Sequence, residues 1–175
     1  MRIALTSLFL LVTATAVAQT PYAGMQTRPL KALSEQQLSD LNAGRGMGLA
    51  LAAELNGYPG PSHVLELADK LELSSDQRRQ VQSLFDSMKA EAQPLGSKLI
   101  AQETDLDRLF ASRAITTDSL KASTTAIAVT QGELRETHLK YHLSTAAILT
   151  PVQMQRYAEL RGYGNSGQPV HRHRH

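Results

Sequence analysis

Two histidines lie four residues apart in the segment THLKYHLS, residues 137–144. Positions i and i+4 share one face of a helix, so the imidazoles of His138 and His142 could bind one transition metal together. The residue after His138 is Leu139 rather than the glutamate that serves a zinc protease as its base, which disfavours a hydrolytic site. In the alternative interpretation, both histidines flank an apolar stripe and are hydrogen-bonded or solvated.

A metal site needs more than two ligands, and the residues one turn before and after the pair are apolar. A third ligand would therefore come from another helix or from a second copy of the chain. On a short helix predicted for residues 62–71, the candidates are His63, Glu66 and Asp69. The metals that imidazole suits in such a site are zinc, copper and nickel.

The end of the chain, QPVHRHRH, is a second place where histidines gather. His171, His173 and His175 alternate with arginines. A disordered run of this kind chelates Cu(II), Ni(II) or Zn(II) weakly and without geometric selectivity. The alternative is a basic end that only keeps the chain soluble. We expect residues 164–175 to be disordered in either case.

The first residues have the pattern of an export signal. Arg2 precedes an apolar run, and Ala16-Val17-Ala18 offers a small-residue cleavage site. We therefore predict a secretory signal peptide at residues 1–18, too short for a membrane span, and a periplasmic mature protein. Residues 19–33 contain proline and glycine without periodicity and predict an extended N-terminal arm.

Composition and charge restrict the possible functions. The chain has no cysteine, so neither disulfides nor thiolate metal sites are available. The net charge is +2 and the basic residues form no stripe, which argues against nucleic-acid binding. No nucleophile has an adjacent base, and Glu103, Asp105 and Asp107 fit a solvated helix face. We expect the protein not to be an enzyme.

The all-helical domain is predicted to begin at residue 34 and to end at residue 163. Ser34 and Gln37 form a capping box, and leucines then recur at near-helical spacing up to Leu55. Gly44 and Gly48 would weaken this helix, so we expect another backbone to approach them closely. The alternative is a mobile glycine-rich segment. NGYPGP, residues 56–61, ends the helix.

Two long helices follow, joined by the turn RAITTD. The first is predicted from the cap Ser74 to about Ser112, with Pro94 removing one hydrogen bond and kinking it. The second carries an apolar heptad: Leu120, Ile127, Leu134, Tyr141 and Ile148. An antiparallel hairpin of helices roughly 45–57 Å long cannot bury both faces alone. We therefore expect a homodimer, or folding back of the first helix.

Two similar motifs open the helices at the two ends of this hairpin. LSSDQ includes Leu73, Ser74 and Gln77, and LTPVQ includes Leu149, Thr150 and Gln153, with Pro151 at the first helical position. The pair resembles the LTxxQ motif of the Spy/CpxP family over residues 62–163. The second motif matches fully, and the first has serine in place of threonine, which can make the same cap.

This resemblance implies an all-α, antiparallel-hairpin homodimer shaped as a shallow cradle. It implies an ATP-independent periplasmic chaperone for unfolded or partly folded client proteins, or a stress-response protein that contacts a membrane sensor kinase. No cofactor is then required. Other members of the superfamily bind zinc, nickel or cobalt, so the alternative function is a periplasmic metal-binding resistance or sensor protein.

Client binding would need adaptable apolar residues beside charge. The sequence does not locate this surface. The methionines that could contribute are Met47, Met88 and Met154, and the basic residues are Arg78, Arg79, Lys89, Lys98, Arg108 and Lys140. In the alternative interpretation Met88 is a core residue and the charges form a solvated face.

Overall fold

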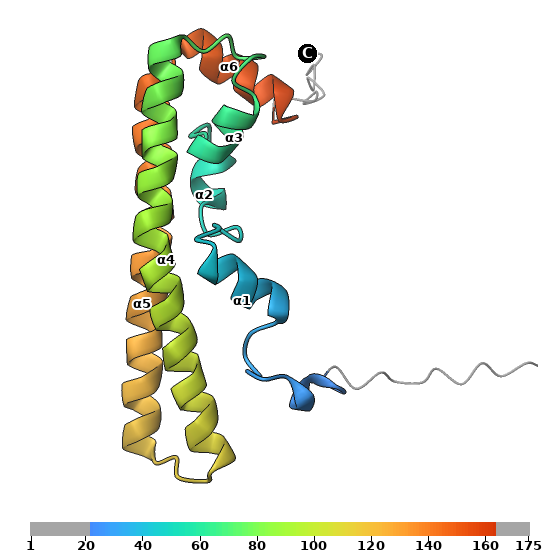
Figure 1. Ribbon diagram of the computed structural model, residues 1–175, viewed down its shortest axis with the longest axis vertical. Helices are drawn as coiled ribbons and strands as arrows, with labels where there is room; N and C mark the ends of the chain where they lie inside the picture. The colour runs from blue at the N-terminus through green and yellow to red at the C-terminus, as the bar shows by residue number, and fades with distance from the viewer. Residues whose placement is uncertain (1–21, 164–175) are drawn as a thin grey trace, which may run out of the picture.

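The structure, a computed structural model, describes residues 22–163, and this part of the chain is helical without a strand (Figure 1). The elements are η1 (Met25–Thr27), α1 (Glu35–Asn42), α2 (Leu51–Glu54), α3 (Pro61–Glu66), α4 (Ser75–Ala111), α5 (Thr117–Ile148) and α6 (Pro151–Leu160). The predicted signal peptide, residues 1–18, lies outside the described residues. So does the predicted tail, residues 164–175, with His171, His173 and His175.

Helices α4 and α5 form the predicted antiparallel hairpin and run side by side along the length of the molecule (Figure 1). The N-terminus of α4 is capped by Ser74, and the helix continues through Pro94 to Ala111. The N-terminus of α5 is capped by Thr116, whose hydroxyl accepts from the Ser119 backbone N–H. The predicted bounds of the first long helix are therefore confirmed.

The other helices pack along one side of this hairpin. Helices α1 and α3 contact α4, and α2 and α3 contact α5 (Figure 1). The beginning of the domain thus folds back on the hairpin, one of the two expected ways to cover its apolar face. None of the described helices covers the opposite side. No described helix is both long enough and apolar enough to cross a membrane.

Two separate apolar clusters form the core, spaced along the hairpin. The first lies where α3 and α6 meet the hairpin and consists of Val64, Ala68, Leu71, Leu73, Val81, Leu149 and Tyr157. The second lies beneath α1 and consists of Leu41, Ala92, Leu99, Ile127 and Leu134. Between them, the part of α5 that begins at Leu134 carries both histidines of the sequence pair.

The single helix predicted from residue 34 to residue 55 is wrong, because the chain turns between α1 and α2. Gly44 and Gly48 adopt left-handed backbone angles, with φ of +66° and +82°, which an α-helix cannot include. The expected close approach is nevertheless present at Gly44. A Cβ there would lie 3.3 Å from the backbone oxygen of Lys89 on α4.

A tighter contact joins α1 to α4. A Cβ on Gly96 would lie 2.3 Å from the backbone oxygen of Leu41, far closer than carbon and oxygen can approach. Only glycine at this position of α4 lets the end of α1 pack directly on the helix. Gly96 therefore fixes where the segment after α1 crosses the hairpin.

The short helix predicted for residues 62–71 is also different in the structure. It begins at Pro61, which occupies the first helical turn, and it ends at Glu66. Residues 67–72 form turns, and Glu72 has a φ of +52°. The part of the predicted arm that the structure describes, residues 22–33, contains η1 and turns, and Leu30 within it is buried.

Candidate functional site

The two helix-start motifs come together at one end of the hairpin. Ser74 accepts a hydrogen bond from the Gln77 backbone N–H (3.1 Å), and Thr150 accepts one from the Gln153 backbone N–H (3.2 Å). Leu73 and Leu149 are both buried in the same apolar cluster. All six predicted motif residues thus belong to one structural unit, although the two motifs lie far apart in the sequence.

The centre of this unit is a pair of side-chain amides, Gln77 and Gln153, which we call the glutamine pair. The Gln77 Nε2 donates to the Gln153 Oε1 (2.9 Å), and the Gln153 Nε2 donates to the Gln77 Oε1 (3.0 Å). Each Oε1 also accepts the backbone N–H of its own cap residue. The second amide hydrogens go to the backbone oxygens of Ile148 and Leu71. Both amides are therefore fully hydrogen-bonded.

The histidine pair lies further along α5 and is buried. His138 is 3% exposed and His142 is 8% exposed, so neither is solvated, and of the two alternatives, hydrogen-bonded or solvated, His142 has the first. The His142 Nδ1 lies 2.6 Å from the backbone oxygen of Tyr58, in the loop before α3. The loop can come this close because Gly60 has no side chain. A Cβ there would lie only 2.7 Å from the His142 ring.

His138 has a different environment. A Cβ on Gly46 would lie 3.4 Å from its ring, so the loop between α1 and α2 packs against it. Its Nε2 is buried and has no hydrogen-bond partner among the described residues. Burial, together with the neighbouring His142, lowers the pKa of His138, and the ring is therefore neutral at neutral pH.

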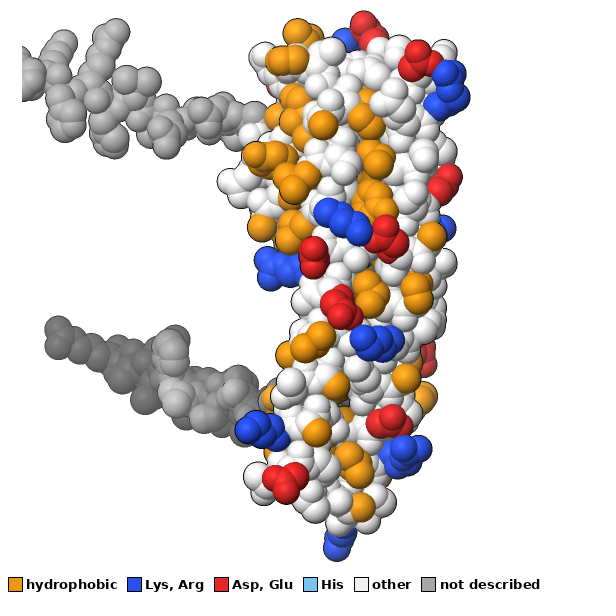
Figure 2. All heavy atoms as spheres, turned by 90° about the vertical axis from the view of Figure 1, so that its left-hand side faces the viewer, with side chains coloured by type: hydrophobic (Ala, Val, Ile, Leu, Met, Phe, Trp, Pro, Cys, Tyr) orange, Lys and Arg blue, Asp and Glu red, His pale blue; other side chains and the backbone are white. Residues whose placement is uncertain are grey.

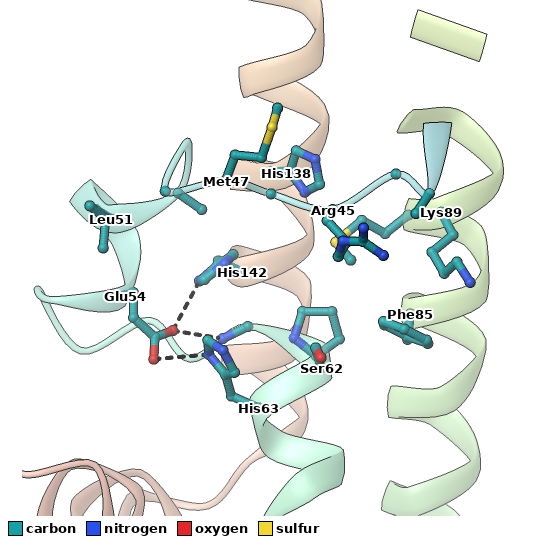
Figure 3. Close-up of a pocket in the computed structure, with 18 residues that line it drawn as sticks. Arg45, Met47, Leu51, Glu54, Ser62, His63, Phe85, Lys89, His138 and His142 are labelled. Carbon is teal, nitrogen blue, oxygen red and sulfur yellow. Dashed lines mark hydrogen bonds and ion pairs between the residues drawn. The ribbon is translucent and has the colours of Figure 1, made fainter. Parts of the chain in front are cut away.

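Glu54, at the end of α2, lies beside His142 and His63 and connects them to α6. Its carboxylate is 5% exposed and lies 3.3 Å from the His63 Nδ1 and 3.7 Å from the His142 Nδ1 (Figure 3). It also accepts hydrogen bonds from the Tyr157 hydroxyl and from the Gly60 backbone N–H. One carboxylate thus joins α2 to α3, α5 and α6.

The charge of Glu54 is stabilised by these partners. Burial alone would raise its pKa, but the hydrogen bonds from His63 and Tyr157, the charge of His63 and the Gly60 N–H outweigh burial and lower the pKa of Glu54 to about 2. Arg161 adds a positive charge, with its Nε 3.7 Å from the Glu54 Oε1. Glu54 was not predicted as a site residue, although an acid within the apolar run LALAAEL was a visible signal.

These contacts show which of the predicted metal ligands lie near the histidine pair. His63 and His142 both lie beside the Glu54 carboxylate. Glu66 instead contacts Ser62, and Asp69 contacts Arg78. Within residues 22–163, no three histidine, aspartate or glutamate side chains converge as a metal site. His138 and His142 therefore have no third ligand from the described part of their own chain.

A pocket of about 520 Å³ lies beside the two histidines (Figure 3). Its walls come from the loop between α1 and α2, the start of α3, and the facing sides of α4 and α5. The side chains that line it include Arg45, Met47, Leu51, Glu54, Pro61, Ser62, His63, Phe85, Met88, Lys89, His138 and His142. The pocket lies between the two core clusters, so both ends of it are supported by packed helices.

The residues proposed for client binding fall into two groups. Met88 is buried and Met154 packs on the first core cluster, so of the three methionines only Met47, at 41%, is exposed. Five of the six basic residues are ion-paired: Arg78 with Asp69, Arg79 with Asp76, Lys98 with Glu133, Arg108 with Asp105, and Lys140 with Glu91. Lys89 instead lies over the Phe85 ring, 5.6 Å from its centroid.

The side of the hairpin away from α1–α3 carries apolar side chains along its length, with charged side chains between them (Figure 2). On α5, Val129 and Leu143 lie two heptads apart and are 53% and 58% exposed. Both are two residues beyond heptad positions that face α4, so both point away from it. This apolar surface was not located by the sequence analysis.

Comparison with known proteins adds no relative: no family model, no curated protein and no solved structure matches the chain.

Proposed function

We propose that this protein is an ATP-independent chaperone or envelope-stress protein of the Spy/CpxP type, exported to the periplasm, and that it is not an enzyme. The observation that carries the proposal is the glutamine pair, because it gives the two LTxxQ-like motifs one shared structural role. Gln77 and Gln153 connect the start of α4 to the start of α6 and so close one end of the long hairpin.

The uncovered side of the hairpin supports the binding part of the proposal. Partly unfolded proteins expose apolar side chains, and an apolar surface with interspersed charge binds them by burying area from both partners. Val129 and Leu143 are exposed apolar residues of this kind. The proposal also includes a homodimer, whose second hairpin would enlarge the binding surface.

Aggregation of an unfolding client protein, followed by light scattering, tests the function directly. The mature chain should suppress scattering in EDTA and without ATP. If it does not, while it does bind the sensor domain of an envelope kinase, the regulatory function replaces the chaperone function. Sedimentation equilibrium at micromolar concentration should give the mass of two chains, and a monomer would contradict the cradle arrangement.

A matched pair of variants tests where clients bind. Leu143→Ser removes an apolar side chain from the uncovered side, and Leu55→Ser removes an equally exposed one from the side that carries α2; each leucine is 58% exposed. We expect Leu143→Ser, combined with Val129→Ser, to weaken suppression and Leu55→Ser to leave it unchanged. Equal effects of both would show that the uncovered side is not the client surface.

A further inference from the structure

The pocket beside the histidines has the size and form of a small-molecule site. Its volume of about 520 Å³ lies within the range of roughly 300 to 1,000 Å³ that is usual for ligand pockets. The loop between α1 and α2 forms one wall of the pocket, because Gly44 and Gly46 allow it to pack closely against α4 and α5. Arg45 anchors this loop through hydrogen bonds to Asp40 and Ser39.

The walls are mainly apolar. Met47 and Leu51 come from the first half of the domain, Pro61 from α3, and Phe85 and Met88 from α4. Methionine side chains adapt to the shape of what they contact, and an aromatic ring adds a flat surface. A ligand that fills this space would therefore have an apolar body.

One charged side chain of the pocket has no ion-pair partner among the described residues. The amine of Lys89 lies over Phe85 and is in no ion pair among the described residues. The Nε2 of His138 also lacks a partner among the described residues, but the atoms around it close it off from the pocket. By contrast, Arg45 is paired with Asp40, and Glu54 is bonded to His63 and Tyr157. The pocket can thus supply one cation to a ligand.

The charges around the pocket also indicate how much charge the ligand carries. A single carboxylate would pair with Lys89 in a partly apolar environment, where such a pair is stronger than in water. A second negative charge would be repelled by Glu54, which lines the same pocket and is ionised. A neutral ligand would leave the ammonium of Lys89 without a counter-charge.

We propose that this pocket binds an amphipathic monocarboxylic acid of the size of a medium-chain fatty acid, with its apolar body against Met47, Phe85 and Met88 and its carboxylate paired with Lys89. This binding does not depend on the proposed chaperone function.

Calorimetric titration of the mature chain with decanoate, below the concentration at which it forms micelles, tests the proposal. We expect saturable binding of one decanoate per chain. Decanol, which has the same chain length but no charge, should bind about tenfold more weakly, or about 1.4 kcal/mol, because it cannot form the ion pair with Lys89. Absence of saturable binding, or equal binding of decanol, would overturn the proposal.

Two lysines on α4 provide a matched comparison. Lys89→Met keeps the apolar stem at the pocket and should weaken decanoate binding about tenfold. Lys98→Met makes the same change further along the helix, where the lysine pairs with Glu133 outside the pocket, and should leave the affinity within about twofold. Equal effects of the two variants would place the ligand elsewhere.

Discussion

The side chains of Gln77 and Gln153 each donate a hydrogen bond to the other, at 2.9 Å and 3.0 Å, between helices whose starts are separated by the whole hairpin. Each amide also accepts from its own helix cap and donates to a backbone carbonyl. Glutamine is required for this arrangement, since glutamate would supply no donor and two carboxylates would repel each other. The third position after each cap is thus both a local helix signal and a tertiary contact.

The first prediction concerns this requirement. In Gln77→Glu the bonds to Ile148 and Gln153 lose their donor, and a charge is placed against two carbonyl oxygens. We expect the free energy of unfolding to fall by about 1 to 3 kcal/mol, measured by urea denaturation with circular dichroism. Gln80→Glu makes the same change on the exposed face of the same helix and should change stability by less than about 0.5 kcal/mol. Similar losses in both variants would mean that the pair does not hold the two motifs together.

The second prediction concerns Glu54 and pH. Its pKa of about 2 lies below that of an unfolded glutamate, so its ionised form stabilises the fold above about pH 4.5. This stabilisation, roughly 3 kcal/mol from a pKa difference of that size, is lost as the pH falls through about 2. The groups that face Glu54 are His63 on α3, His142 on α5, and Tyr157, Arg161 and Tyr163 in or after α6.

Glu54→Gln should therefore be less stable than the original chain at neutral pH, with the difference shrinking between about pH 4.5 and 2. Unfolding in urea at a series of pH values measures this. Glu72→Gln is the control, because Glu72 forms an exposed ion pair with Arg156, and such pairs contribute about 1 kcal/mol or less. A difference that does not vary with pH would show that the charge of Glu54 is not what stabilises the domain.

Local signals explain why the hairpin could be predicted from the sequence. Ser74 and Thr150 are each followed three residues later by glutamine, and the apolar stripes between them have an unbroken helical period. These patterns depend on neighbouring residues only, so the starts of α4 and α6 were found. The cap at Thr116 was missed because its partner is Ser119 rather than glutamate or glutamine.

Long-range contacts explain what could not be predicted. The turn between α1 and α2 depends on the contact of Gly44 with α4, and a periodic sequence does not show it. The spacing of His138 and His142 indicated a shared site, but their actual neighbours come from other elements. Glu54 and Tyr157 lie 103 residues apart and meet only in the folded domain. The pocket therefore could not be predicted from the sequence, although several of its residues were among the predicted site residues.

The third prediction concerns the contact between α1 and α4. A methyl group on residue 96 would meet the backbone of Leu41 at 2.3 Å, so Gly96→Ala must push α1 away from the hairpin. We expect a loss of about 1 to 3 kcal/mol in the free energy of unfolding. Gly132→Ala on α5, where a Cβ meets nothing within 4 Å, should instead stabilise the helix by up to about 1 kcal/mol. If Gly96→Ala were also stabilising, α1 would not be packed on α4.

The fourth prediction separates the two places where histidines gather. The His142 Nδ1 is close to the Tyr58 oxygen, and the described residues supply no third ligand, so we expect the buried pair not to bind metal. Calorimetric titration with Zn(II), Cu(II) and Ni(II) should therefore give weak binding to the full mature chain, because His171, His173 and His175 can chelate. This binding should persist in His138→Ala and disappear in a chain that ends at Gly167. Tight binding that survives the truncation and is lost in His138→Ala would instead establish a metal site at the buried pair, with its missing ligand supplied by a second copy of the chain.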